Sequence, residues 1–210
     1  MLKSRHHFIV YPFFQHYTRY LLRTRYHTVS IENHFADNGN AVLLIGNHVG
    51  WWDGFWAMYL NLKVLKRKFH FMMLEEQLMR YRFFNYTGAF SVDKGSRSVV
   101  ESIRYASELL NDSKNMLLMY PQGRLHSMYE HHFQFEKGIE RMLKNRERKV
   151  QVVFSANLVD CFTEPKPSLS IYTENYEGAF TVEALVHAYN DFYARCLEKQ
   201  FAKAENKDKT

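Results

Sequence analysis

The sequence has little cysteine and no long hydrophobic run. Two cysteines, Cys161 and Cys196, occur among 210 residues. They form no C-x-x-C pair and neither is flanked by ligands at zinc spacing, so we expect two buried, reduced thiols of a cytosolic protein. No apolar run reaches the length of about 18 residues that a membrane-spanning helix needs. We therefore expect a chain that does not cross a membrane.

Acidic residues are absent before Glu32. That stretch holds four histidines, seven aromatic residues and the basic residues Lys3, Arg5, Arg19, Arg23 and Arg25, in a chain whose formal net charge is +6. A basic, aromatic segment suits an anionic partner, either a nucleic acid or a membrane of acidic lipids. No recognisable nucleic-acid-binding motif is present, which favours the membrane surface.

The beginning of the chain does not resemble a signal peptide, because its apolar stretch is short and Pro12 interrupts it. Proline is tolerated in the first turn of a helix, and the residues that follow have an amphipathic pattern. One face would carry Phe13, Phe14, Tyr17, Tyr20 and Leu21, and the opposite face His16, Arg19 and Arg23. We expect residues 1–28 to lie on the inner face of the cell membrane; the alternative is a helix that caps the domain core.

From residue 29 onward, short apolar runs alternate with amphipathic stretches. This alternation predicts a single α/β domain over residues 29–202, with a mostly parallel central sheet flanked by helices, and a flexible tail over 203–210. The expected strands are 41–46, 69–74, 88–92, 115–120, 149–159 and 169–172. The expected helices are 52–65, 75–84, 96–110, 135–145 and 180–201.

Three unusual stretches directly follow predicted strands: GNHVGWWD, VDKGSR and YPQGRLHS. In open α/β sheets, ligands bind beyond the carboxyl ends of the strands. We therefore expect these stretches to meet at one edge of the sheet.

His48 and Asp53 are the candidate proton-transfer pair in the first stretch. With His48 in the turn and Asp53 in the first helical turn, the carboxylate can accept a hydrogen bond from one imidazole nitrogen and leave the other free to take a proton. No Ser or Cys nucleophile is nearby, which indicates that the substrate brings the hydroxyl. The alternative is that His48 ends a strand and Asp53 caps a helix.

Basic side chains in the other two stretches are candidate anion ligands. Gly123 lies in a tight turn that can direct N–H groups outward, and Arg124 can bind phosphate in a bidentate manner. Lys94 and Arg97 lie near an expected helix start, which favours anions. A plain surface turn and a solvated loop are the alternatives.

The four stretches NHVGWWD, GAFSVDK, YPQG and FEKG resemble, in this order, the glycerolphosphate and lysophosphatidate acyltransferases of the N-H-x4-D type. The resemblance covers roughly residues 41–172 and includes Asn47. On this basis we expect the substrate to be bound by Asn47, Lys94, Arg97, Gln122, Gly123 and Arg124. It implies that His48 takes the proton of the acceptor hydroxyl, that Asp53 orients His48, and that the hydroxyl attacks the thioester of acyl-CoA or acyl-carrier protein. These are co-substrates, and no cofactor is implied.

Three residues depart from the family pattern. Lys94 replaces an arginine, Gln122 a glutamate and Arg124 a threonine. Gln122 cannot be a charged acceptor, although it can hydrogen-bond. These changes leave open a lysophospholipid-like acceptor, a lipid acceptor without phosphate, or a non-catalytic relative that binds lipid.

Two further features have alternative interpretations. The histidines and glutamate of HSMYEHHF lack the spacing of a metal site, so we expect a polar loop over the active site and no metal ion. Trp51, Trp52 and Trp56 are candidates for an acyl channel, for the core or for a membrane interface.

Overall fold

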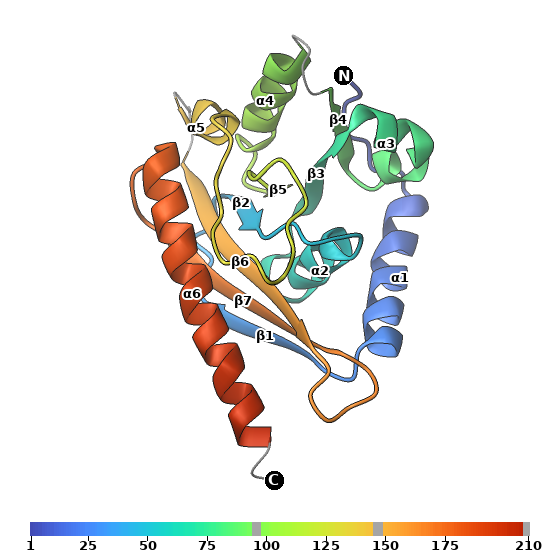
Figure 1. Cartoon of the computed structure of the whole chain (residues 1–210). Coiled ribbons are helices and arrows are strands. Elements are labelled where there is room, and N and C mark those ends of the chain that lie inside the picture. The colour runs from blue at the N-terminus through green and yellow to red at the C-terminus, as the bar shows by residue number, and fades with distance from the viewer. Residues whose placement is uncertain (94–97, 145–148, 208–210) are drawn as a thin grey trace.

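The computed structural model describes residues 1–93, 98–144 and 149–207. A seven-stranded sheet forms its centre, in the order β1-β7-β6-β2-β5-β3-β4 (Figure 1). Neighbouring strands are parallel except β6 and β7, which are antiparallel. The expected α/β fold with a mostly parallel sheet is therefore confirmed. The strands are β1 (Val29–His34), β2 (Ala41–Gly46), β3 (Lys68–Leu74), β4 (Ala89–Val92), β5 (Asn115–Met119), β6 (Val150–Asp160) and β7 (Ser168–Tyr176).

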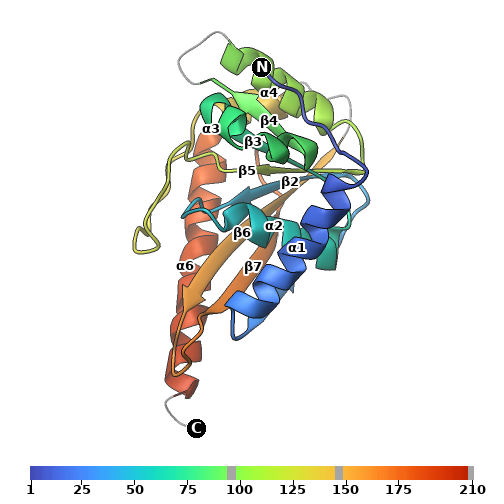
Figure 2. The ribbon, with the colours of Figure 1, turned by 90° about the vertical axis from the view of Figure 1, so that its right-hand side faces the viewer.

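Helices cover both faces of the sheet (Figures 1 and 2). The α-helices are α1 (Val10–Arg25), α2 (Asp53–Leu60), α3 (Glu75–Arg80), α4 (Ser98–Leu109), α5 (Gly138–Leu143) and α6 (Val182–Lys207). A π-helical turn, η1 (Asn61–Leu65), follows α2, and a 3₁₀ turn, η2 (Arg82–Tyr86), follows α3.

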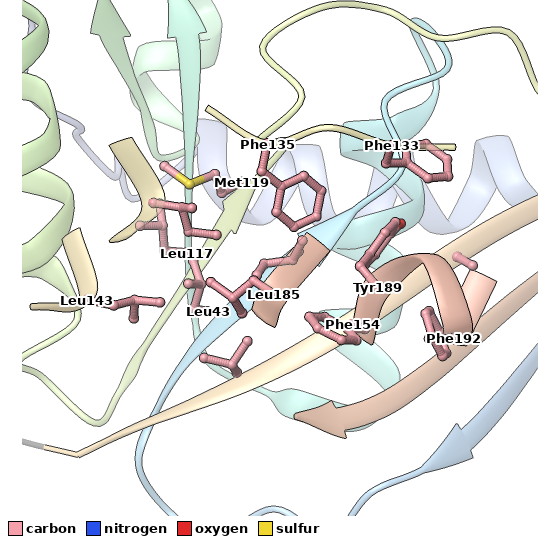
Figure 3. Close-up of a cluster of buried hydrophobic side chains, with 14 of the residues drawn as sticks. Leu43, Leu117, Met119, Phe133, Phe135, Leu143, Phe154, Leu185, Tyr189 and Phe192 are labelled. Atoms are coloured by element: carbon pink, nitrogen blue, oxygen red, sulfur yellow. The ribbon is translucent and has the colours of Figure 1, made fainter. Parts of the chain in front are cut away.

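The central strand β2 is buried on both sides, because successive side chains of a strand point to opposite faces. Leu43 and Ile45 pack with residues of α4, α5 and α6, among them Leu185 and Tyr189 (Figure 3). Val42 belongs to the other cluster, with residues of α1 and α2. This two-sided packing fixes where β2 ends, and the candidate residues follow directly after that end.

Helix α1 caps the core with some of its apolar residues and exposes the others. Phe14, Leu21 and Leu22 are buried against the sheet side, whereas Phe13 and Tyr17 are exposed. The five apolar residues expected on one face therefore divide between the core and the surface. Residues before α1 also join the domain, since the Ser91 N–H donates to the Leu2 carbonyl.

Several boundaries differ from the sequence expectations. Strand β1, which pairs with β7, was not expected. The expected helix over 52–65 divides into α2 and η1, and Lys66 follows with a left-handed backbone (φ 54). The closing helix extends to Lys207 rather than Phe201. These ends are set by packing between distant segments, to which local patterns are insensitive.

Both cysteines are free, and only one matches the expectation of burial. Cys196 is buried in α6, whereas Cys161 is exposed after β6. Within residues 1–93, 98–144 and 149–207, no helix has the length and apolar character needed to span a membrane.

Candidate active site

The candidate residues gather where β2 and β5 end side by side. The two strands are parallel, with Ile45 opposite Met119. His48 is the second residue after β2, and Tyr120 is the first after β5. Because parallel strands end at the same edge, the stretches GNHVGWWD and YPQGRLHS are brought together as expected.

His48 and Asp53 form the hydrogen-bonded pair expected from their spacing. The distance between His48 Nδ1 and Asp53 Oδ2 is 2.7 Å. The Asp53 side chain is 1 % exposed, whereas that of His48 is 32 % exposed. A Nδ1–H donor directed at the carboxylate leaves Nε2 as an acceptor on a ring that solvent can reach.

Backbone groups hold the Asp53 carboxylate in place. The Val49 and Gly50 N–H groups donate to Oδ2 over 2.8 and 3.0 Å. Asp53 is also the first residue of α2, where the helix dipole stabilises a negative charge. The chain after β2 therefore folds back around the carboxylate. This local turn brings His48 and Asp53, which are five positions apart, into contact.

The ring of Tyr120 lies flat against His48. The ring centroids are 4.5 Å apart and the planes differ by 10°. Burial, reinforced by the charge of Asp53, raises the pKa of the Tyr120 phenol well above its usual value. The stacked residue is therefore a neutral phenol at physiological pH.

Gln122 and Asn47 are buried at this edge and bind the protein itself. Gln122 is 5 % exposed, and its Nε2 donates to the Gly46 carbonyl over 3.1 Å. The Asn47 amide donates to the Asn157 carbonyl and accepts from the Asn157 N–H, over 3.0 and 2.8 Å. Gln122 thus holds the end of β2 from the turn after β5, and Asn47 attaches that end to β6.

Comparison with known proteins agrees with this arrangement. Residues 27–155 match the acyltransferase family. The chain belongs to that family. The resemblance that the motifs indicated is therefore confirmed, and family membership supports a transferase activity with an acyl donor and a lipid acceptor. No curated protein shows significant similarity to the chain.

In this acyltransferase, the turn after β5 continues into a long loop that leads to α5 (Figures 1 and 2). Gly123 has a left-handed backbone (φ 66), and the Arg124 side chain is 67 % exposed. Further along, the His126 N–H donates to the His48 carbonyl over 2.7 Å. Glu130 pairs with His126 Nδ1 at 2.6 Å and with Arg124 at 3.5 Å. The loop is therefore attached to the turn that carries the candidate base.

The two remaining candidate anion ligands, Lys94 and Arg97, lie outside the described residues. Among the described residues, no group of three or more His, Cys, Asp or Glu side chains is arranged to hold a metal ion.

The tryptophans beside His48 differ in environment. Trp56 is buried and donates its indole N–H to the Tyr26 hydroxyl over 3.0 Å. Trp51 is 57 % exposed, and its ring contacts Tyr81 and Phe84. Trp56 therefore belongs to the core, and Trp51 is available to a ligand or a surface.

Two residues at the site escaped the sequence analysis. Asn157 carried no signal, because it lies within an apolar strand 110 positions from its partner Asn47. Tyr120 stood in the quoted YPQG stretch, but nothing in the sequence indicated that its ring would reach His48.

Proposed function

We propose that the chain transfers a fatty acyl group from acyl-CoA or acyl-carrier protein to the hydroxyl of a lysophospholipid-like acceptor, with His48 as general base. The observation that supports this most is the 2.7 Å contact between His48 Nδ1 and Asp53 Oδ2, with the carboxylate buried and the imidazole accessible. Among the described residues, the His48 side chain is hydrogen-bonded to Asp53 and to no Ser or Cys, which supports a base that acts on a substrate hydroxyl.

The proposed step begins when the acceptor hydroxyl hydrogen-bonds to His48 Nε2. The oxygen attacks the thioester carbonyl carbon while its proton passes to Nε2, and Asp53 stabilises the imidazolium that forms. The tetrahedral intermediate then collapses with cleavage of the carbon–sulfur bond. The thiolate leaves and takes the proton from Nε2, so that an ester and a free thiol result and His48 is restored.

Binding of the acceptor head group involves the residues beyond β4 and β5. Arg124, on an exposed turn with Gly123, offers a guanidinium fork suited to phosphate, and Lys94 and Arg97 would add charge. Gln122 and Asn47, which are buried, would act by shaping the end of β2. A neutral Gln122 is compatible with an acceptor that lacks phosphate. The activity assay must therefore include acceptors with phosphate and acceptors without it.

The surface beside the site favours a membrane location, as expected for enzymes of phospholipid synthesis. Exposed apolar side chains lie just before α1, on α1 itself and in the turn after β2. They are Phe8, Ile9, Phe13, Tyr17, Tyr20 and Trp51. Arg19 and Arg23 are exposed on the same helix. Aromatic and basic side chains together suit the head-group region of an anionic membrane, and we place the protein peripherally on its inner face.

Activity is tested by incubating the protein with palmitoyl-CoA and, separately, palmitoyl-carrier protein. The acceptors are a lysophosphatidate, a lysophosphatidylglycerol and a monoacylglycerol, and the measurements are thiol release and the acylated product. We expect acceptor-dependent release that falls by about 10³-fold or more in His48→Ala. Normal transfer by His48→Ala would refute the proposed base. Lipid binding without acceptor-dependent release would identify a non-catalytic lipid-binding protein.

Membrane binding is tested by flotation with vesicles of neutral or partly anionic phospholipid. We expect binding to increase with anionic lipid and to weaken at high salt. The double variant Phe13→Ser/Trp51→Ser should lose most binding. The control Phe201→Ser alters a similarly exposed aromatic residue on α6 and should bind normally. Equal binding by both variants would contradict this location for the membrane surface.

A further inference from the structure

We propose that Tyr120 is a positioning residue for the general base: its ring holds the plane of the His48 imidazole, while Asp53 holds the Nδ1 edge. This inference rests on the proposed role of His48. It assigns to Tyr120 a part in the reaction through His48 rather than a contact with substrate.

The two contacts restrain different motions of the same ring. Asp53 contacts one imidazole atom, Nδ1, at 2.7 Å. A single hydrogen bond leaves the ring free to pivot about that contact, and such a pivot moves Nε2 out of line with an acceptor hydroxyl. The Tyr120 ring, parallel to within 10° at 4.5 Å, blocks this pivot on one face. Together the contacts define where Nε2 lies.

Gly46 makes room for the stack. A β-carbon at Gly46 would lie 3.1 Å from Tyr120 Cε1, which is closer than such contacts normally are. The ring therefore uses space beside the chain that glycine leaves open, just ahead of His48. The same turn that carries Tyr120 also carries Gln122, which donates to the Gly46 carbonyl. One turn thus binds the end of β2 and supports the ring that follows it.

The aromatic ring, and not the hydroxyl, carries the proposed role. The Tyr120 hydroxyl is buried and has no hydrogen-bond partner among the described residues. A buried hydroxyl without a partner contributes no net stabilisation, so replacing tyrosine by phenylalanine should preserve the stack at little cost. Replacing it by leucine keeps an apolar side chain but removes the flat face.

The experiment compares Tyr120→Leu with Tyr120→Phe, and uses Phe69→Leu as the matched control. Phe69 is a buried ring that stacks on Phe71 in β3. It lies beside Met116 near the start of β5, whereas Tyr120 follows the end of that strand. We expect Tyr120→Leu to lower kcat by about 10- to 100-fold with KM little changed, because a small displacement of a catalytic group has effects of that order. Tyr120→Phe should recover kcat to within about threefold of the wild type on the same grounds.

Loss of stability alone would not produce this pattern. Both leucine variants should unfold at lower denaturant concentration, because both lose a buried ring. Only Tyr120→Leu should also lose kcat. Equal kcat in Tyr120→Leu and Phe69→Leu, or a loss in Tyr120→Phe as large as in Tyr120→Leu, would overturn the inference.

A second measurement is independent of catalysis. In protein with ¹⁵N-labelled histidine, the carbon-bound ring protons of His48 should resonate upfield because they lie over an aromatic face. This shift should persist in Tyr120→Phe and vanish in Tyr120→Leu. If the shift follows this pattern but His48→Ala retains activity, the proposed base is wrong and the stack is real. If His48→Ala is inactive and the shift is absent from the wild type, the inference about Tyr120 fails by itself.

Discussion

Two histidines of this protein, His48 after β2 and His70 within β3, have opposite environments. His48 lies beyond the end of β2, is partly exposed and has the Asp53 carboxylate as its partner. His70 lies within β3 and is buried. Its nitrogens contact the Ser4 hydroxyl at 2.9 Å and the Asn115 amide oxygen at 3.3 Å.

These partners satisfy both nitrogens of a neutral His70 ring. The Ser4 O–H can donate to Nδ1 and the Nε2–H to Asn115, so no second proton is needed. Burial, with the nearby His6 as a further cause, lowers the pKa of His70 to about 3. The comparison shows that a histidine inside this sheet is removed from proton exchange. Solvent access and a carboxylate partner are the features that suit His48 to the proton transfer proposed for it.

The largest expected effect comes from removing the carboxylate that distinguishes His48. In Asp53→Asn, the amide can no longer stabilise the imidazolium or enforce the Nδ1–H tautomer. We expect kcat to fall by about 10³-fold, equivalent to about 4 kcal/mol of transition-state stabilisation. Steady-state thiol release measures the change, with His70→Gln as the control whose kcat should stay near that of the wild type. Activity of Asp53→Asn within a few-fold of the wild type would remove the distinction between the two histidines.

A second prediction concerns stability in acid. An unfolded histidine takes up a proton near pH 6.5, whereas His70 in the fold stays neutral to about pH 3. The unfolded state therefore binds more protons in this window, so stability is complete above pH 6.5 and is lost as the pH falls. We expect His70 to account for a loss of about 2 kcal/mol by about pH 5, which urea titrations at a series of pH values will measure.

The matched variant for this measurement is His70→Gln. It should start from a lower stability and show a flatter decline between about pH 6.5 and pH 5. A residual slope will remain, since burial also lowers the pKa of His6 to about 4. An unchanged slope in His70→Gln would show that other groups cause the acid sensitivity.

The smallest expected effect concerns the hydrogen bond between Gln122 and the end of β2, just before His48. Gln122 donates to the Gly46 carbonyl, and a glutamate would place a carboxylate against that oxygen. We expect Gln122→Glu to lose about 1–2 kcal/mol of stability at pH 7, measured by urea denaturation. The family pattern has glutamate at this position, so acceptor turnover is measured in parallel. A variant that is more stable than the wild type would show that Gln122 does not support the strand end through this bond.

The contact between His48 and Asp53 was predictable because its geometry is local. His48 and Asp53 are five positions apart, and a buried strand followed by a helix start leaves few ways to connect them. The α/β class was equally accessible, since it depends on alternating patterns along the chain. Edge strand β1 was missed, because Val29 and Ile31 alternate with polar residues over a short stretch.

The supporting residues of the site were not predictable in this way. Asn47 and Gln122 were expected to bind substrate, and the structure shows both hydrogen-bonded to other strands or turns. An amide side chain makes the same hydrogen bonds to a ligand as to a neighbouring backbone group. Which of the two it binds depends on which strand lies alongside. In the strand order β6-β2-β5, the backbones of β6 and of the end of β2 lie within reach of Asn47 and Gln122.

By itself, the sequence determined the type of chemistry: a histidine and a carboxylate in a turn, in an α/β chain of the acyltransferase family. Tertiary structure alone decided what surrounds that pair. It stacked Tyr120 on His48, buried Gln122 and Asn47 at the end of β2, and divided the apolar residues of α1 between core and surface. The physical reason is that hydrogen bonds within one turn depend on neighbouring residues, whereas burial and stacking depend on segments that are distant in the chain.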